Sequence, residues 1–251
     1  MSRDELLALL HQTLNAERIA DYCPNGLQVE GKTHIQRIVT GVTASQALID
    51  AAIAQQADAI LVHHGYFWKN ENPVVTGIKH RRLKALLQHD INLIAYHLPL
   101  DVHPQLGNNA QLGKMLQLEQ MQPVANVSPE GVLMQGHFSA AKTLAQCTAL
   151  VSQLLGRTVL AEDGGIGEIS RVAWCTGGGQ NYIEQAATAG AQLFITGEVS
   201  EQTIHSAREL GIHFIAAGHH ATERYGIKAL GEWLAGQGQL DVHFIDIANP
   251  A

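Results

Sequence analysis

The chain has 251 residues, 46% of them hydrophobic, and a formal net charge of −7. No apolar run reaches the roughly 18 residues of a membrane span, and Asp4 and Glu5 stand where a signal peptide needs basic and then apolar residues, so we expect a cytoplasmic protein. Lysine and arginine form no cluster, which argues against long nucleic acid and favours a small anionic substrate as the partner.

Helices and strands are expected to alternate along the first half. Leucines at helical spacing predict an amphipathic helix over residues 3–16, and the segment DYCPNGLQVEG, 21–31, predicts a tight loop. Strands are predicted at 35–39, 59–62 and 91–96, and helices at about 45–56, 78–90 and 108–118, with Thr43 or Ser45 as the cap of the first. This alternation predicts an α/β fold with a largely parallel sheet.

The second half begins less clearly. Residues 119–168 predict a connector, a short strand at 133–138, a helix at 144–156 and a loop at 161–169. The residues that follow are similar in sequence to the first half at an offset of 134, so that 169–172 aligns with 35–38 and 193–195 with 59–61. Further along, LGIHFIAAG (210–218) resembles HDINLIAYH (89–97). We predict two related α/β units that can interlace, 1–123 and 124–251, with LDVHFIDI as an added strand.

Histidines close three of the predicted strands. They are His63 and His64, His97 with Asp101 four residues on, and His219 and His220 with Glu223. Ligands of open α/β sheets bind outside the carboxyl ends of the strands. Inside a strand, neighbouring histidines would point to opposite faces, but at a strand end followed by Gly65 both can turn to one site.

These side chains suit metal binding. Imidazoles and carboxylates without thiolate fit Zn, Fe, Mn, Co or Ni and do not select among them. Four or five such ligands exceed the needs of one catalytic ion, whereas two ions about 3.5–4 Å apart, bridged by a carboxylate and a water, would use them all. The plainer alternative is that each histidine is a satisfied core or surface residue.

A glycine-rich turn, CTGGGQ, follows a predicted strand and precedes a helix. Backbone N–H groups of Gly177, Gly178 and Gly179 can cradle a phosphate, but a purely structural turn is an equal alternative because the phosphate-loop lysine pattern is missing. Cys175 beside the turn is read as a buried small residue rather than a nucleophile.

Seven segments together carry a family resemblance: DYCPNGLQVEG, IVTGVTAS, ADAILVHHGYFWK, YHLPLDVHPQLGNNAQL, VAWCTGGGQ, FITGEVSEQTIHSARE and GHHATERYG. The chain resembles the Nif-three-like family, whose members are often labelled GTP cyclohydrolase 1 type 2 homologues. The resemblance covers nearly the whole chain, and only about 119–168 is poorly matched.

The resemblance implies a dinuclear metal site in the cleft between two similar α/β domains, in subunits that form a toroidal hexamer. Carried over by position, the metal ligands are His63, His64, Asp101, His219 and Glu223, while His97 is either an acid–base group or a ligand.

The leading functional hypothesis is a metal-dependent hydrolase for a nucleotide or related heterocycle. In a cyclohydrolase-type reaction, hydroxide attacks purine C8, opens the imidazole ring and releases formate, with His97 as the proton carrier. A damaged nucleotide in a clean-up pathway fits the same site. The alternatives are a metal-dependent phosphoesterase, a non-catalytic metal-binding or metal-delivery protein, and a ring-shaped scaffold.

Overall fold

The computed structural model describes residues 1–251 and divides into two compact units. The first comprises residues 1–100 and 226–248, and the second comprises 101–225 and 249–251. The predicted boundary after residue 123 lies inside the second unit, because β5 (Glu119–Pro123) pairs with β6 (Met134–Lys142) and a cut there would separate the two strands. Asp101, expected in the first unit, is therefore part of the second.

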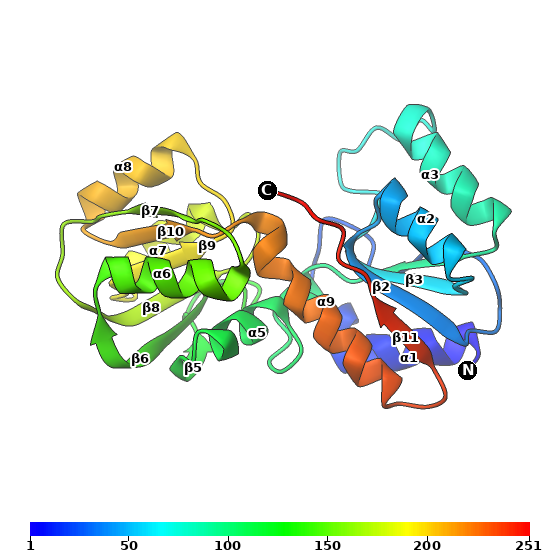
Figure 1. Ribbon diagram of the computed structural model, residues 1–251, viewed down its shortest axis with the longest axis horizontal. Helices are drawn as coiled ribbons and strands as arrows, with labels where there is room; N and C mark the ends of the chain where they lie inside the picture. Colours follow the sequence, from blue (N-terminus) through cyan, green and yellow to red (C-terminus); the bar gives the residue numbers. More distant parts are fainter. The chain divides into compact units, whose positions relative to one another are not determined.

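Five strands form the sheet of the first unit, in the order β1-β4-β3-β2-β11 (Figure 1). Their bounds are Gly26–Val29, Asn92–Ala95, Ala59–His64, Arg37–Thr43 and Asp241–Phe244. Only β1 is antiparallel to its neighbour, so the prediction of a mostly parallel sheet is confirmed here. Two details were wrong: β1 lies in a segment predicted as a loop, and β11 belongs to this unit rather than to the second.

Helices cover both faces of this first sheet (Figure 1). α2 (Gln46–Ala54), capped by Ser45 as predicted, and α3 (Gly77–Gln88) bury Leu48, Ile49 and Leu86 against strand residues that include Ile60. α1 (Arg3–Leu14) and the later part of α9 (His219–Ala235) lie on the opposite face. A short turn, η1 (Ala16–Arg18), follows α1. The capping box of Ser2 and Glu5 sets the start of α1 at the predicted position.

The second sheet has the strand order β5-β6-β8-β9-β10-β7. Beyond β5 and β6, its strands are β7 (Leu160–Glu162), β8 (Ile169–Cys175), β9 (Leu193–Thr196) and β10 (His213–Ala216). Only the pairings β8–β9 and β9–β10 are parallel, so this sheet is mixed and the prediction of mostly parallel sheets is wrong for it. Antiparallel neighbours can be joined without a helix, as β5 and β6 are by residues 124–133, whereas parallel neighbours need a longer crossover connection, usually a helix.

Two apolar cores lie on the two faces of the second sheet. One packs Leu112 of α5 (Asn108–Met115) and Val151 of α6 (Leu144–Leu155) against Trp174. The other packs α7 (Ile183–Thr188), which follows η2 (Gln180–Tyr182), and α8 (Glu201–Leu210) against Phe194 and Phe214. A short helix, α4 (Leu98–Asp101), leads from β4 to this unit.

The two units share one strand register. β2 pairs Ile38 with Ala59 of β3, and β8 pairs Val172 with Leu193 of β9, which is the same register at the offset of 134 seen in the sequence. The antiparallel edge strands show the same pairing at two positions: Leu27 of β1 pairs with Ile94 of β4 as Ala161 of β7 pairs with Ile215 of β10, and the residue before each pairs in the same way. Beyond Leu27 a bulge shifts the register of β1, and β7 has no such bulge. The internal repeat therefore extends to an edge strand where the sequence alone shows no similarity.

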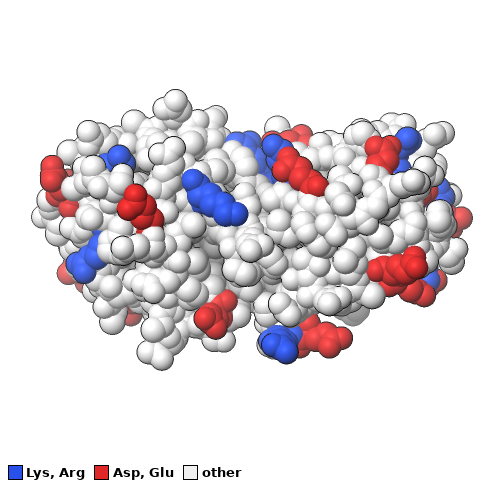
Figure 2. Space-filling model, turned by 90° about the horizontal axis from the view of Figure 1, so that it is seen from below, with Lys and Arg blue, Asp and Glu red and all other residues white.

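The face of the molecule in Figure 2 carries no large patch of one charge. Lysine, arginine, aspartate and glutamate side chains are scattered and mixed on the face in Figure 2. None of the helices combines the length and the apolar composition that a bilayer crossing needs.

Candidate metal-binding residues

Three imidazoles meet at the carboxyl end of the first sheet. His63 and His64 end β3, and His97 follows β4. The ring centroid of His63 lies 4.4 Å from that of His64 and 5.1 Å from that of His97, and one nitrogen of each ring lies within 4.8 Å of the others. The prediction that these histidines gather where the parallel strands end is confirmed.

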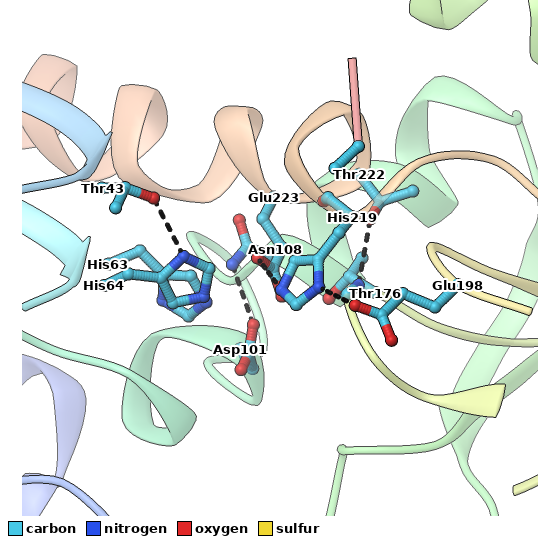
Figure 3. A network of polar contacts seen from close by, with 12 residues as sticks. Thr43, His63, His64, Asp101, Asn108, Thr176, Glu198, His219, Thr222 and Glu223 are labelled. Carbon is cyan, nitrogen blue, oxygen red and sulfur yellow. Dashed lines mark hydrogen bonds and ion pairs between the residues drawn. The ribbon is translucent and has the colours of Figure 1, made fainter. Parts of the chain in front are cut away.

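Each of the three rings is held through Nδ1. The partner of His63 is the carbonyl oxygen of Tyr96 at 3.1 Å, that of His64 is the Thr43 hydroxyl at 3.2 Å (Figure 3), and that of His97 is the Asp21 carboxylate at 3.0 Å. A carbonyl or a carboxylate can only accept, so Nδ1 of His63 and of His97 carries the proton. In the neutral ring Nε2 then bears the lone pair, which is the arrangement of metal-ligating histidines.

Asp21 fixes the orientation of the His97 ring by its hydrogen bond to Nδ1. Its carboxylate also accepts hydrogen bonds from the backbone N–H of Leu98 at 2.9 Å and from the Asn25 amide at 3.0 Å. Burial raises the pKa of Asp21, but the hydrogen bonds from His97, Asn25 and Leu98 outweigh it and lower the pKa to about 2. The sequence analysis missed Asp21, because it precedes His97 by 76 residues and no spacing rule joins them.

The second unit supplies a histidine held between two carboxylates. His219 and Glu223 lie one turn apart at the start of α9, with Nε2 and Oε2 separated by 3.1 Å, and Glu198 Oε1 lies 2.7 Å from Nδ1 (Figure 3). Burial lowers the pKa of His219, yet Glu223 and Glu198 raise it more strongly, to about 9. Glu198, to which the sequence analysis assigned no role, thus orients His219 as Asp21 orients His97.

Asp101 is a second buried carboxylate of this unit. The residue is 6% exposed, and Oδ1 accepts a hydrogen bond from the Asn108 amide at 2.8 Å (Figure 3). Burial raises the pKa of the Cys175 thiol well above its ordinary value, and the carboxylates of Asp101 and Glu223 raise it further. A thiol kept neutral in this way is a poor nucleophile, which supports the reading of Cys175 as a packing residue.

The glycine turn serves the structure of this region. The N–H of Gly177 donates to the Thr222 hydroxyl at 3.0 Å, and the N–H of Gly179 donates to the Thr196 hydroxyl at 3.1 Å. The N–H groups of Gly177 and Gly179, engaged in this way, do not point at a ligand, which favours the structural alternative over the phosphate cradle predicted for Gly177, Gly178 and Gly179. A Cβ on Gly177 would collide with the carboxylate of Glu223, which explains the glycine there.

The residues present fit divalent metal ions by their chemistry. Two nitrogens of a tetrahedral zinc site lie about 3.4 Å apart, so small ring rotations bring nitrogens that start within 4.8 Å of one another onto one ion. His219 and Glu223, at 3.1 Å, already have the separation of two ligands of the same ion. Imidazole and carboxylate ligands suit Zn, Fe, Mn, Co or Ni, as expected from the sequence.

Comparisons with known proteins place these residues in a wider context. A family model described as Duf34/NIF3 (NGG1p interacting factor 3) matches residues 1–250. A protein of Yersinia pestis named "GTP cyclohydrolase 1 type 2 homolog" is 61% identical over 252 residues, with 100% of both chains covered. A solved structure described as "protein ybgI, unknown function" has 56% identity and a TM-score of 0.96, and one from Thermus thermophilus has 34% and 0.91, each over 100% of both chains.

Proposed function

Because the chain belongs to the Duf34/NIF3 (NGG1p interacting factor 3) family, we propose that it is a metal-dependent hydrolase that acts on a nucleotide or a related heterocycle. The observation that carries the proposal is the group of three imidazoles, each held through Nδ1, with the lone pair of His63 and of His97 placed on Nε2. The name shared by the curated relatives supports a purine nucleotide such as GTP as the substrate class.

The proposed metal content is two divalent cations per chain. His63 and His64 of the first unit and Asp101, His219 and Glu223 of the second are the proposed ligands, and the dinuclear centre stays a prediction from the sequence. Such cations, when bound, would lower the pKa of water enough to supply hydroxide near neutral pH.

The chain's own residues would manage the protons of the reaction. Water adds to purine C8 and the ring opens to a formamide, from which a second water releases formate and leaves a diaminopyrimidine. His97 would take a proton at Nε2 from the attacking water and return it to the departing ring nitrogen, while Asp21 keeps the ring in that tautomer.

Metal analysis tests the proposed ligands. Purified wild-type protein is expected to hold two divalent ions per chain by elemental analysis, and His63→Ala and Glu223→Ala are each expected to lower that number. His80→Ala and His205→Ala, which remove exposed histidines from α3 and α8, are the matched controls and should retain both ions. Unchanged metal content in His63→Ala and Glu223→Ala would contradict the proposal.

Product analysis tests the reaction. Metal-loaded protein, incubated with a panel of purine nucleotides, is expected to release formate, and His97→Ala should abolish that release with little loss of metal. Inorganic phosphate without formate would instead establish the phosphoesterase alternative. If the protein holds both metal ions but converts no nucleotide of the panel, the alternative of a non-catalytic metal-binding or metal-delivery protein is supported.

A further inference from the structure

A cavity in the second unit is lined by residues that, apart from Asp101, have no role in the proposed metal site. Its volume is about 340 Å³, and it lies beside Asp101, between α5 and the strands β5 and β6. Cavities that hold small organic ligands begin at about 300 Å³. The size therefore suits a single ring system rather than an extended chain.

The walls of this cavity are largely apolar and contain two thioethers. Ala110 of α5, Met121 of β5 and Met134 of β6 line it together with Val102 and Pro104. Methionine sulfur makes favourable contacts with the edges and faces of aromatic rings, and its flexible side chain adapts to their outline. Such walls suit a flat aromatic ligand.

Polar side chains also line the cavity, and acceptors outnumber donors among them. Asp101 and Glu130 each contribute a carboxylate. His103 accepts the N–H groups of Gln105 and Leu106 at Nδ1, at 3.2 and 3.0 Å, so the neutral ring carries its proton on Nε2 and can donate there. A ligand that complements these groups is a heterocycle rich in N–H donors.

The cavity is held in shape by buried hydrogen bonds. The Asn109 amide donates to the carbonyls of Gly131 and Val132 at 2.9 and 3.0 Å, and its Oδ1 accepts the N–H of Thr176 at 2.9 Å. Gly131 adopts φ +90° and packs against Val102, where a Cβ would lie 3.2 Å from the carbonyl oxygen. A ligand would meet walls that are already formed.

We propose that this cavity binds the base of the substrate and selects a guanine-type edge. The inference rests on the proposed function, which it deepens by naming the group that recognises the base. The ring lies against the methionines of β5 and β6, and Glu130 accepts the N1–H and the 2-amino group side by side, as a carboxylate can. The bound base then lies next to Asp101, one of the proposed metal ligands.

Binding of uncharged nucleosides tests the cavity without recourse to catalysis. Equilibrium dialysis of the full chain, as purified and after chelator treatment, is expected to show guanosine bound more tightly than inosine, and inosine more tightly than adenosine. Glu130→Gln should weaken guanosine binding about tenfold, because a hydrogen bond to a charged group is lost, and should bring guanosine close to adenosine. Glu119→Gln, an exposed carboxylate of β5 outside the cavity, is the control and should leave the order unchanged.

Two filling variants give an independent result. Ala110→Leu and Met134→Trp occupy the cavity from different elements and should each abolish guanosine binding, with the fold checked by circular dichroism. Equal binding of the three nucleosides, or guanosine binding that survives Glu130→Gln and either folded filling variant, would overturn the proposal. Guanosine binding without metal or formate release would refute the proposed function alone, whereas formate release with an unchanged KM in the filling variants would refute the cavity alone.

Discussion

At the scale of single residues, the carboxylates behind the histidines matter as much as the histidines. Asp21 and Glu198 each bond Nδ1 of a histidine, at 3.0 and 2.7 Å, and so fix which nitrogen meets a metal or a substrate. Both come from distant parts of the chain and neither follows a spacing rule. Their removal should affect function while the proposed ligands themselves stay intact.

The first prediction concerns Glu198. Glu198→Ala removes the acceptor that orients His219, and we expect a loss of metal affinity of about 10- to 100-fold, measured by competition with a chromogenic chelator. Glu201→Ala changes an exposed glutamate three residues later and should behave as wild type. Equal affinities in the two variants would mean that Glu198 does not orient His219.

The second prediction compares two glycines with positive φ. Gly177 has φ +64° and Gly156 has φ +68°, but a Cβ on Gly177 would meet the Glu223 carboxylate, whereas nothing lies within 4 Å of one on Gly156. Gly156→Ala should cost about 1–2 kcal/mol of unfolding free energy from backbone strain alone. Gly177→Ala should lower the unfolding free energy by more than Gly156→Ala does, and it should also lower the metal content because Glu223 has to move. Urea unfolding and metal analysis that give the same values for the two variants would contradict this prediction.

At the scale of elements, the repeat preserves hydrogen bonds as well as register. Asp58 accepts the N–H groups of Gln36 and Arg37, each at 2.9 Å, and Gln192, 134 residues later, accepts those of Ser170 and Arg171, each at 3.0 Å. In the first unit the residue just before β3 accepts hydrogen bonds from the start of β2. In the second unit the residue just before β9 does the same for the start of β8. In each case a single side-chain oxygen accepts both hydrogen bonds: Oδ2 of the Asp58 carboxylate and Oε1 of the Gln192 amide. Of these two side chains, only the carboxylate is charged.

The third prediction uses this natural pair. Asp58→Ala leaves two N–H groups without their acceptor and should lower the unfolding free energy by about 1–3 kcal/mol, whereas Asp58→Asn should keep both bonds, as Gln192 does, and lose less than about 1 kcal/mol. Urea unfolding at pH 7 measures both. Equal losses would show that the acceptor oxygen is not what matters.

The same substitution has a pH signature. Burial raises the pKa of Asp58, but hydrogen bonds from Arg37, Lys32 and Gln36 outweigh it and hold the pKa below the ordinary value of 3.8. A carboxyl whose pKa is lower in the folded state stabilises the fold above its unfolded pKa, and this stabilisation is lost as the pH falls through the folded pKa. Between about pH 5 and pH 3, the wild type should therefore lose more stability than Asp58→Asn; parallel curves would contradict this.

At the scale of the whole molecule, the chain passes between its two units three times. It leaves the first unit after Leu100, returns to it at Gly226 within α9, and leaves again after Ala248. Each unit is therefore built from two segments that are far apart in the sequence. The clearest case is β11, which pairs with β2 at the edge of the first sheet. Removal of the last residues, from β11 onward, should expose the edge of β2 and destabilise the first unit.

The fourth prediction concerns assembly. The family resemblance implies a ring of six subunits, and we expect light scattering during gel filtration to give six times the subunit mass of 27.1 kDa. A monomer or dimer across a tenfold range of concentration would contradict the hexamer. It would leave the metal and cavity proposals intact, because the residues that carry them belong to one chain.

The sequence by itself determined the alternation of helices and strands, the repeat and the placing of His63, His64 and His97 together at strand ends. These follow from local periodicity and from the rule that parallel strands present their carboxyl ends at one edge. Only the tertiary structure revealed the edge strands β1 and β7, the two compact units that each combine separate segments, the bonded N–H groups of Gly177 and Gly179, and the carboxylates of Asp21 and Glu198. Each of these depends on hydrogen bonds or strand pairings between residues far apart in the chain, which no local pattern encodes.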